Sequence, residues 1–527
     1  MGEGCYGGVL IIEQNDGTAS LITNNCTFKN NCVDYYGGAF YSQYAEVFIN
    51  NSTFIENYAY YSGGAISSEG GNVFINNSTF LTNSADDDAG AIYSEEATFF
   101  INDSVFIKNE ATTGGALSCG DATFFINNSM FRENIASNGG AIYGYNLELT
   151  RCNFTSNRVD ENGGAIFYLL NLTVDDCNFI ENHADSYGGA IMDMGERYYP
   201  NLIGYTTINN SRFIKNTADK DGGAILEYTT RSEYDEVDID DPTTGNYILI
   251  KNSEFTENEA KGTGGVINLQ NGFNTTIERS NFTNNTANKA GAIFVNNNGL
   301  NLSIVSSNFF GNNASTDGGV IYVKSNNVLI QDSSIENYNA TGKGGFIYLD
   351  SCSNLTINNS NFTNQPSEDS STQCIGYGGV IYQEKNSNIT INNSNFKNNK
   401  AYINGGAIYQ KEHGMIMVSS SNFTNNELIK KTSAAYDGGA IYQDSYGILN
   451  ISNSSFKENK ARSGAAIYQW SNGNMYLNDT LFYNNHAKEN GGIYQVSNCI
   501  LFINNSYFNE NSAETRVEQF INMIMVL

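Results

Sequence analysis

The sequence has few of the residues that break extended backbone, and it has no segment typical of a membrane helix. Only three prolines and one tryptophan occur in 527 residues. No apolar run approaches the roughly 20 residues that a membrane-spanning helix needs, and no apolar secretory core follows Met1. No helical period of 3.6 residues persists over a useful length. These absences argue against a helical protein and against membrane insertion by this chain.

Basic residues are also scarce. The chain has 27 Lys and Arg against 55 Asp and Glu, which gives a formal net charge of −28 and a pI near 4.4. Such a charge repels phosphate backbones and anionic lipid surfaces. We therefore expect neither nucleic acid nor an anionic membrane surface among the partners.

What the chain has in abundance is one short motif, Gly-Gly-Ala-Ile, as at Gly63–Ile66. Sites of this type, some of them degraded, start at residues 7, 37, 63, 89, 114, 139, 163, 188, 222, 264, 290, 318, 344, 378, 405, 438, 464 and 491. Most spacings are 24 to 28 residues. A unit this short cannot bury its own apolar face, so its copies must stack on one another as in a solenoid.

Each repeat also contains a phenylalanine that is preceded by alternating apolar and polar residues. Around Phe80, the apolar residues Val73 and Ile75 stand two apart, Asn77 follows them, and Ser78 is small. This alternation is typical of a strand. The pattern predicts one repeat per coil, with three short strands and three turns, and like residues stacked about 4.8 Å apart.

In this stacking, Phe lies on Phe and Ile on Ile in the interior, while Asn lies on Asn at the turns, where side-chain amides can bond to each other. The paired glycines fit a corner that needs positive φ or a close backbone approach. The fold class predicted is therefore all-β, a single-stranded right-handed parallel β-helix (β-solenoid) of about 18 coils of 24 to 28 residues.

The Gly-Gly-Ala-Ile and Phe-x-x-Asn motifs resemble the repeats of chlamydial polymorphic outer-membrane proteins. They also resemble the Asn-rich, adhesin-like β-helix proteins of methanogenic archaea and other anaerobes. The second motif is seen at Phe54/Asn57, Phe80/Asn83, Phe179/Asn182 and Phe456/Asn459. The resemblance covers essentially the whole chain and implies a surface-exposed, pectate-lyase-like β-helix used in adhesion or cell-envelope display.

One continuous β-helix is expected over residues 1–513, followed by a non-repeat tail at 514–527. Four insertions interrupt the repeat, at 192–206, 226–247, 365–376 and 427–436. Since no signal peptide or anchor is evident, we expect the chain to be a segment of a longer secreted or cell-surface protein.

Insertions emerge as loops from a regular solenoid and are a usual place for binding. The insertion at 226–247 is strongly acidic, with its carboxylates at Glu233, Asp235, Glu236, Asp238, Asp240 and Asp241. This loop could bind Ca²⁺ or a basic partner, although its spacing is not that of an EF-hand. A merely solvated acidic loop is the alternative. No other cofactor or metal is expected.

A row of tyrosines forms a second candidate binding surface. Tyrosine follows the Gly-Gly-Ala-Ile core in many repeats, and in the C-terminal part it recurs as Tyr-Gln at Tyr382, Tyr409, Tyr442, Tyr468 and Tyr494. Alternation from an inward isoleucine places these side chains outside as a stacked ladder. The ladder could contact sugar rings or a partner's backbone, or it could only reinforce the sheet.

Two further residue types have two interpretations each. Asn-Phe-Thr sequons place an asparagine just before the inward phenylalanine, and glycosylation is expected first at Asn153, Asn281, Asn361 and Asn422. Cys152 and Cys177 fall in the small inward column of adjacent coils. They are interpreted as reduced core thiols, with a disulfide between them as the alternative.

Polysaccharide lyases and hydrolases share this architecture, so an enzyme is the rival class. Inverting glycosidases need two carboxylates roughly 6.5–9.5 Å apart, but the Asn-Thr-Asp, Gly-His-Gly and Arg-x-Lys segments of polygalacturonases are absent. No residue is therefore predicted to be catalytic. The sequence favours an extracellular or cell-surface rod, an adhesin or display scaffold, that binds glycans or surface proteins of a host or neighbouring cell.

Overall fold

The structure is a computed structural model of the chain, and it describes most of the 527 residues. The described ranges are 7–13, 19–195, 204–228, 246–270, 273–296, 301–324, 327–350, 353–364, 376–429, 436–515 and, for the backbone, 524–526. The chain divides into two compact units, unit 1 (Met1–Gly272) and unit 2 (Phe273–Leu527). Within the described residues both units are parallel β-solenoids without helices, with about 17 turns counted over the two units.

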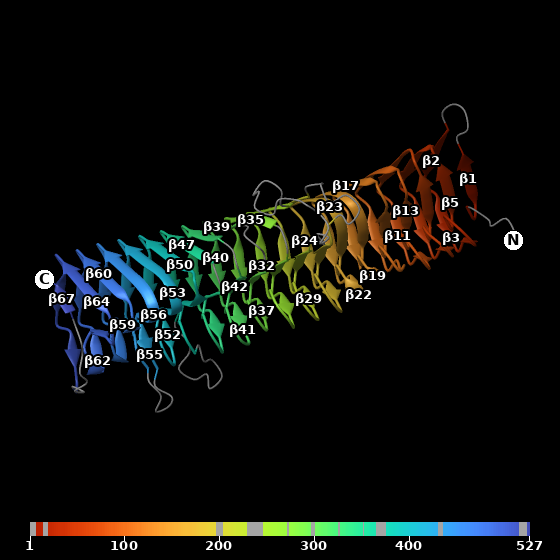
Figure 1. Cartoon of the computed structure of the whole chain (residues 1–527). Helices are drawn as coiled ribbons and strands as arrows, with labels where there is room; N and C mark the ends of the chain where they lie inside the picture. Colours follow the sequence, from red (N-terminus) through yellow and green to blue (C-terminus); the bar gives the residue numbers. More distant parts are fainter. Residues whose placement is uncertain are drawn as a thin grey trace, which may run out of the picture. The chain divides into compact units, whose positions relative to one another are not determined.

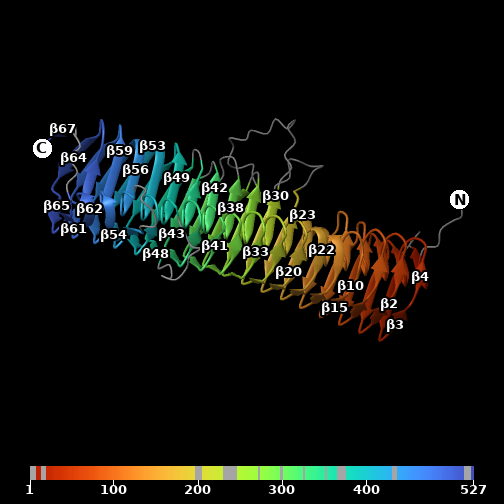
Figure 2. The ribbon, with the colours of Figure 1, turned by 90° about the horizontal axis from the view of Figure 1, so that it is seen from below.

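One coil of unit 1 shows how a repeat folds. It contains β9 (Ile66–Glu69), β10 (Asn72–Asn76), β11 (Thr79–Leu81) and β12 (Ser84–Ala85). Each strand pairs in parallel with the equivalent strand of the next coil, as β10 does with β14 (Thr98–Asn102). Equivalent strands therefore form columns, which we number first to fourth in chain order (Figures 1 and 2).

The expectation of three strands per coil needs a correction, because most coils contain four strand segments. The first and second columns belong to one sheet, and the third and fourth columns form separate sheets. In some coils the first two segments run together as a single strand, such as β20 (Ile142–Thr150) and β53 (Ile408–Ser419). In β53 the corner is made by His413 and Gly414, which have positive φ values of 45° and 114°.

The remaining strands of unit 1 follow the same order. They are β1 (Leu10–Glu13), β2 (Ser20–Asn24), β3 (Thr27–Lys29), β4 (Cys32–Val33), β5 (Phe40–Gln43), β6 (Glu46–Asn50), β7 (Thr53–Ile55), β8 (Tyr58–Ala59), β13 (Ile92–Ser94), β15 (Val105–Ile107), β16 (Leu117–Cys119), β17 (Thr123–Asn127), β18 (Met130–Arg132), β19 (Ile135–Asn138), β21 (Asn153–Thr155), β22 (Arg158–Asn162), β23 (Ile166–Asp175), β24 (Asn178–Ile180), β25 (His183–Ala184), β26 (Ile191–Asp193), β27 (Tyr205–Asn209), β28 (Arg212–Ile214), β29 (Thr217–Ala218), β30 (Ile225–Tyr228), β31 (Asn246–Lys251), β32 (Glu254–Thr256), β33 (Glu259–Ala260) and β34 (Ile267–Gln270).

Unit 2 repeats this arrangement. Its remaining strands are β35 (Phe273–Glu278), β36 (Asn281–Thr283), β37 (Thr286–Ala287), β38 (Ile293–Asn296), β39 (Asn301–Val305), β40 (Asn308–Phe310), β41 (Asn313–Ala314), β42 (Ile321–Lys324), β43 (Asn327–Gln331), β44 (Ser334–Glu336), β45 (Asn339–Ala340), β46 (Ile347–Leu349), β47 (Asn354–Asn358), β48 (Asn361–Thr363), β49 (Ile381–Lys385), β50 (Asn388–Asn392), β51 (Asn395–Lys397), β52 (Lys400–Ala401), β54 (Asn422–Thr424), β55 (Glu427–Leu428), β56 (Ile441–Ser452), β57 (Ser455–Lys457), β58 (Lys460–Ser463), β59 (Ile467–Ser471), β60 (Asn474–Asn478), β61 (Leu481–Tyr483), β62 (His486–Asn490), β63 (Ile493–Gln495), β64 (Ile500–Asn504), β65 (Tyr507–Asn509), β66 (Ser512–Ala513) and β67 (Ile524–Val526).

The interior of each unit is made of stacked identical side chains, as the repeat predicts. The ring centroids of Phe54 and Phe80 lie 4.7 Å apart, and those of Phe80 and Phe106 lie 4.8 Å apart, with the rings nearly parallel. All three side chains are fully buried. Each burial contributes roughly 1.5–3 kcal/mol of transfer free energy. The predicted columns of phenylalanine are confirmed.

The asparagine of Phe-x-x-Asn forms a buried ladder at the turn between the third and fourth columns. The Nδ2 of Asn83 donates to Oδ1 of Asn109 at 3.0 Å and to the backbone oxygen of Phe54 at 3.1 Å. The backbone N–H of Asn83 donates to the same Oδ1 at 3.0 Å. Each side-chain amide thus bonds to the coil before it and to the coil after it, which explains why no other side chain replaces it in most coils.

The two glycines of the motif have different tasks. Gly63 has a φ of 70°, which favours glycine at that corner. A Cβ on Gly64 would lie 2.2 Å from the backbone oxygen of Gly90 in the next coil, so this position needs the close approach that only glycine allows. Both predicted reasons for the glycine pair are therefore confirmed.

Cys152 and Cys177 lie in adjacent coils at the buried small column, and both are free thiols. The Sγ of Cys177 accepts a hydrogen bond from the backbone N–H of Cys152 at 3.2 Å, in the place that a serine hydroxyl takes in other coils. The reduced interpretation is the one that the geometry supports. The expectation of one continuous β-helix over 1–513 stays a prediction.

Candidate functional site

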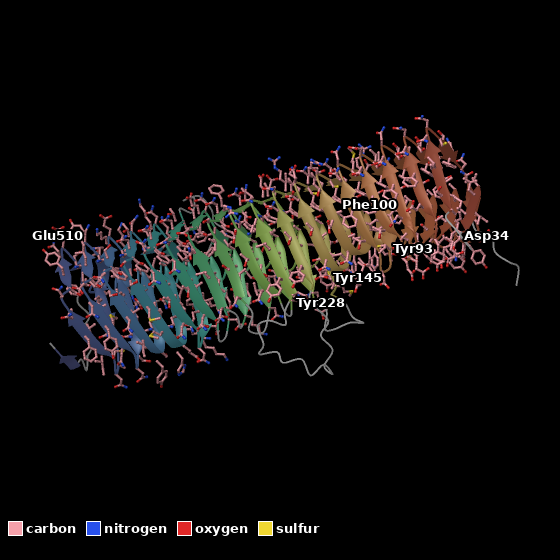
Figure 3. All side chains as sticks on the ribbon, turned by 90° about the horizontal axis from the view of Figure 1, so that it is seen from above. Asp34, Tyr93, Phe100, Tyr145, Tyr228 and Glu510 are labelled. Atoms are coloured by element: carbon pink, nitrogen blue, oxygen red, sulfur yellow. The ribbon has the colours of Figure 1, made fainter. Side chains whose placement is uncertain are left out.

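The broad outer face of the first and second columns carries the side chains that alternate with the buried ones. We call this surface the outer sheet face, and we call the outward residue after the buried isoleucine, such as Tyr382 after Ile381, the tyrosine column. The residue two positions further, such as Glu384, also points outward and belongs to what we call the acidic column. In unit 1, Figure 3 shows Phe100 on this face and Tyr93, Tyr145 and Tyr228 along its edge.

In unit 2 the tyrosine column is a continuous ladder, as the sequence predicts. The ring centroids of Tyr382 and Tyr409 lie 5.2 Å apart, those of Tyr409 and Tyr442 5.1 Å, and those of Tyr442 and Tyr468 4.9 Å. These rings are parallel within 6°. Tyr494 continues the row at 5.4 Å from Tyr468, but its ring is tilted by 50°.

The ladder is more enclosed than an open sugar-binding surface would be. Tyr382 is 2% exposed and Tyr468 is 3% exposed, and the faces of their rings are covered by neighbouring tyrosines. A sugar that stacks on an aromatic residue needs a free ring face, whereas this row presents only ring edges and hydroxyls. The reinforcing role is therefore the one that the geometry supports, and binding by this ladder stays a prediction.

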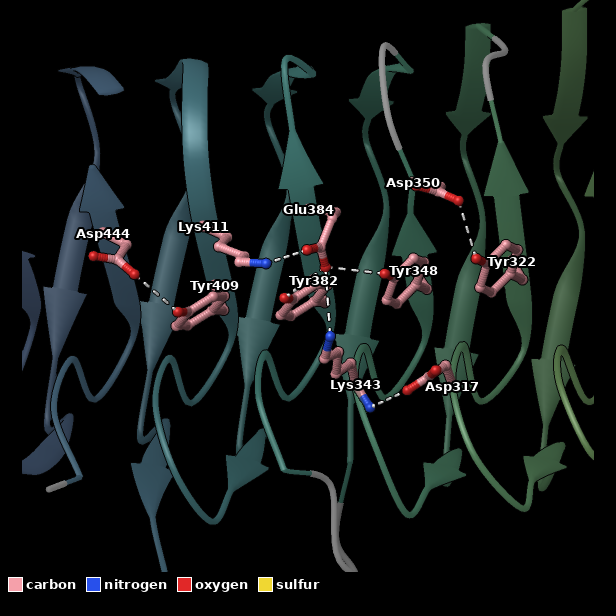
Figure 4. Close-up of polar contacts among 10 residues, drawn as sticks. All are labelled: Asp317, Tyr322, Lys343, Tyr348, Asp350, Tyr382, Glu384, Tyr409, Lys411 and Asp444. Atoms are coloured by element: carbon pink, nitrogen blue, oxygen red, sulfur yellow. Dashed lines mark hydrogen bonds and ion pairs between the residues drawn. The ribbon is translucent and has the colours of Figure 1, made fainter. Parts of the chain in front are cut away.

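Glu384 connects the ladder to its charged neighbours. Its Oε2 accepts hydrogen bonds from the hydroxyls of Tyr382 at 2.8 Å and Tyr348 at 3.0 Å (Figure 4). Lys343 Nζ lies 3.4 Å from the same oxygen, and Lys411 forms a second ion pair with this carboxylate. Partial burial alone would raise the pKa of Glu384, but the bonds from Lys411 and the two tyrosines, together with Lys343, lower it to about 2.

The ammonium group of Lys343 also lies over the tyrosine rings. Its Nζ is 4.8 Å from the ring centroid of Tyr382 and 5.8 Å from that of Tyr348, within the range of a cation–π interaction. Burial, followed by the nearby carboxylates, raises the pKa of the hydroxyls of both tyrosines, which therefore remain hydrogen-bond donors. In unit 2 the outer sheet face thus holds its own cation between tyrosines and a carboxylate.

The acidic insertion lies outside the described residues, and so do the carboxylates of Glu233, Asp235, Glu236, Asp238, Asp240 and Asp241. The same holds for most of the insertions at 192–206, 365–376 and 427–436. The described part of the chain has no group of three or more His, Cys, Asp or Glu side chains that could hold a metal ion. Calcium binding at 233–241 stays a prediction, and the measurement that checks it is thermal stabilisation by added Ca²⁺.

The four candidate glycosylation sites are exposed and begin strands of the third column. Asn153 begins β21, Asn281 begins β36, Asn361 begins β48 and Asn422 begins β54. Their side chains are part of outer amide ladders, as in the bond from Asn178 Nδ2 to Asn153 Oδ1 at 2.8 Å. Their outward direction agrees with the expectation, and glycosylation itself stays a prediction.

One surface feature was missed in the sequence, although its signal was present. Phe48, Phe74, Phe100 and Phe125 stack on the outside of β6, β10, β14 and β17, with centroids 4.9, 5.0 and 5.2 Å apart. All four are half-buried. Each precedes the inward isoleucine by one residue, so strict alternation places it outside. We call this row the outer phenylalanine ladder.

A ladder of amides runs beside these rings. Asn76 Nδ2 donates to Asn50 Oδ1 at 3.2 Å, and Asn102 Nδ2 donates to Asn76 Oδ1 at 3.3 Å. The outer sheet face of unit 1 therefore presents a flat strip of ring edges next to a strip of amides.

A second feature missed in the sequence is a pair of acids in the interior of unit 1. Glu227 and Asp193 are almost completely buried, and the hydroxyl of Tyr168 donates to Glu227 Oε2 at 2.9 Å. The hydroxyls of Tyr168 and Thr206 are also hydrogen-bonded. Because this pair is closed off from solvent, it cannot reach a polysaccharide, and it does not supply the exposed pair of acids that a glycosidase needs.

The fold and these surfaces define a class, the parallel β-solenoids. Within the chain, residues 25–43, 48–69, 210–226 and 393–411 match the family model described as the Chlamydia polymorphic membrane protein (Chlamydia_PMP) repeat. The chain thus contains repeats of this type, as the resemblance of its motifs predicted. No curated protein and no solved structure gives a significant match to the chain.

The family model matches the residues that build the coil. The segment 48–69 contains the inward Phe54, the buried Asn57 and the glycine pair at 63 and 64, and all of these are buried. Among the residues that the structure describes, none lies in a helix long and apolar enough to cross a membrane.

Proposed function

We propose that the chain is an extracellular or cell-surface β-solenoid that binds a glycan or a protein on another cell's surface. The observation that carries this proposal is that each repeat contains two sets of residues, one that builds the coil and one that faces outward. The residues of the matched repeat build the coil, whereas the outward columns do not support the fold in the same way and some of them vary from coil to coil. In unit 1 the tyrosine column reads Tyr41, Ser67, Tyr93, Ser118 and Tyr143.

The location follows from the type of repeat. The matched repeat is named for membrane proteins of Chlamydia, and repeats of this type point to an outer-membrane or cell-surface protein. An acidic, proline-poor solenoid agrees with such a position, because it is rigid and presents long repeated faces. We class the chain as a binding protein rather than an enzyme.

We place the binding on the outer sheet face of unit 1. The outer phenylalanine ladder exposes apolar ring edges, and the neighbouring asparagine ladder exposes amides that both donate and accept hydrogen bonds. Apolar contact next to a small number of directed polar groups is the usual composition of a recognition surface. An uninterrupted row of partly exposed rings also needs a reason other than stability, because exposed apolar patches usually mark interaction sites.

The test is binding by the whole chain to a glycan array and to cells treated with either glycosidases or proteases. A triple variant, Phe48→Ser, Phe74→Ser and Phe100→Ser, should reduce binding at least tenfold. The matched control changes Ile55, Leu81 and Ile107 to Ser, three half-buried outward residues of the third column, and should bind normally.

The two cell treatments separate a glycan partner from a protein partner. Full binding by the triple phenylalanine variant, with its fold intact by circular dichroism, would remove the outer sheet face as the binding surface. Release of oligosaccharides from a panel of polysaccharides by the purified chain would overturn the classification as a binding protein.

A further inference from the structure

The outer sheet face of unit 1 contains a pocket that the binding surface above does not include. It has a volume of about 320 Å³ and lies beside the tyrosine and acidic columns of the first coils. Three tyrosines and three carboxylates line it, together with Gln43, Ser67 and Ser68: they are Tyr36, Tyr41, Tyr93, Glu13, Glu69 and Glu95. Aromatic rings and acids are the two groups that attract an organic cation.

The pocket exists because the tyrosine column is interrupted here. Tyr41 pairs in register with Ser67, and Ser67 pairs with Tyr93, so a serine stands where the ladder of unit 2 has a further ring. The ring of Tyr36 lies 6.5 Å from the rings of both Tyr41 and Tyr93 and forms the third aromatic side.

The carboxylates line one side of the pocket. Glu13 pairs in register with Gln43, and Gln43 pairs with Glu69, so these residues share the acidic column. Glu69 Oε2 accepts hydrogen bonds from the hydroxyl of Tyr41 at 2.5 Å and from Gln43 Nε2 at 3.2 Å. These two bonds fix the carboxylate beside the tyrosines, as Glu384 is fixed beside Tyr382 in unit 2.

Among the described residues that line this pocket, none is a lysine, arginine or histidine. Residues 30 to 107 contain ten Asp and Glu and no Lys, Arg or His. Among the described residues, no ion pair involves Glu69 or Glu95. A cation that enters the pocket is attracted by the carboxylates that line it, and the surrounding sequence does not provide such a cation.

Unit 2 shows what the same columns do when a cation is present. There, Lys343 lies 4.8 Å from the ring of Tyr382 and 3.4 Å from the carboxylate of Glu384. Tyr93 and Glu95 occupy the same positions of their coil as Tyr382 and Glu384, since each pair follows the buried isoleucine by one and three residues. Unit 1 therefore has the tyrosine and the carboxylate of this arrangement. In unit 2 the chain itself supplies the ammonium group, from Lys343.

We propose that the pocket lined by Tyr36, Tyr41, Tyr93, Glu69 and Glu95 binds an alkylammonium group from outside the chain. The ammonium takes the place that Lys343 has in unit 2, over the tyrosine rings and beside the carboxylates. A lysine side chain of a partner protein and a free polyamine share this chemistry. The proposal is independent of the binding surface assigned to the outer phenylalanine ladder.

Titration calorimetry with the whole chain tests the proposal with four probes: Nα-acetyl-lysine amide, the same compound acetylated on its ε-amine, spermidine, and the neutral disaccharide maltose. The lysine derivative and spermidine should bind, and the ε-acetylated compound and maltose should bind at least tenfold more weakly. Tighter binding of the lysine derivative than of spermidine identifies a protein side chain as the source, and the opposite order identifies a polyamine.

Three variants assign the binding to this pocket. Glu69→Gln and Tyr93→Leu should each weaken lysine binding at least fivefold, and Ser67→Tyr should abolish it by filling the pocket with a ring. The control Glu110→Gln removes an exposed charge outside the pocket and should leave binding unchanged.

Circular dichroism checks that each variant is folded, and Glu69→Gln decides the matter if Ser67→Tyr does not fold. Equal affinity for the ε-acetylated compound, or unchanged affinity in both Glu69→Gln and Tyr93→Leu, would overturn the proposal. Binding of maltose alone would show that the pocket takes a neutral sugar instead.

Discussion

Asp193 and Glu227 show how a single inward position can change the chemistry of a coil. Most coils place an apolar residue, a serine or a glutamine there, for example Val323, Ser68 or Gln410. In these two coils an acid fills the position, and no cation among the described residues acts on either carboxyl group. Burial raises the pKa of Asp193 to about 7, and it raises the pKa of Glu227 well above its usual value. Tyr168, a third titratable group of this cluster, is also held neutral by burial, which raises the pKa of its hydroxyl well above the usual value.

This pair makes the stability of unit 1 depend on pH. A carboxyl with a raised pKa in the folded state stabilises the fold below its unfolded pKa, near 4, and loses that contribution as pH rises through its folded pKa. We expect the free energy of unfolding of unit 1 to fall between pH 4.5 and 7.5, on the order of 3 kcal/mol for Asp193, since one pKa unit corresponds to about 1.4 kcal/mol.

Urea unfolding at both pH values measures this difference. The double variant Asp193→Asn and Glu227→Gln should lose most of the pH dependence, and the exposed control Glu148→Gln should keep it. Equal pH dependence in the double variant and in the unchanged chain would contradict the prediction.

At the scale of a single coil, the glycine pair sets the distance between turns. A Cβ on Gly115 would lie 2.3 Å from the backbone oxygen of Gly140, whereas a Cβ on Gly120 would come no closer than 3.4 Å to any atom. The chain places an alanine in the second glycine position once, at Ala465. There the following glycine, Gly491, is not among the residues with positive φ, so the next turn has a different local conformation.

We therefore expect Gly115→Ala to destabilise unit 1 by about 1–3 kcal/mol, since the added methyl group must push two backbones apart. Gly120→Ala is the matched control and should change the free energy of unfolding by less than about 0.5 kcal/mol. Urea denaturation of both variants decides the point, and equal effects of the two substitutions would show that the close approach is not what requires glycine at 115.

Much of the coil could be predicted from the sequence, because stacking repeats each residue's environment. The inward Phe54, the turn amide of Asn57 and the glycine pair each recur at a fixed spacing, and the spacing alone implies a column. The division of the first sheet into two strand columns was missed, because the corner between them has no fixed residue pair: it is Gly70 and Gly71 in one coil and His413 and Gly414 in another. The buried acids were missed because they interrupt a column instead of repeating it.

The candidate sites were harder to predict for the same reason. Tyr382 and its neighbours repeat, so the ladder was foreseen, but its polar contacts depend on Lys343 and Glu384, which contact tyrosines of different coils. The pocket over Ser67 arises from a missing side chain. A missing side chain of this kind cannot be recognised from a motif. It becomes visible only when the repeats are aligned and Ser67 is seen to stand where other repeats have tyrosine.

For the whole molecule, net charge is the dominant property. With 55 acidic and 27 basic residues, the folded chain repels itself at low ionic strength, and salt screens this repulsion. Thermal melts in 20 and 300 mM NaCl should show a higher melting temperature in the more concentrated salt, by about 1–2 °C for each kcal/mol of repulsion relieved in a chain of this length. A lower melting temperature at 300 mM would show that specific ion pairs outweigh the general repulsion.

The in-register pairing of successive turns has a consequence for how such a gene can change. Asn57, Asn83 and Asn109 lie 26 residues apart and make the same bonds to their neighbours. An unequal crossover could remove or duplicate one stretch of 26 residues. The two coils that it brings together would still pair in register, with each asparagine donor next to its asparagine acceptor. Such recombination can therefore lengthen or shorten this kind of protein by whole coils, while single substitutions of outward residues alter what it recognises.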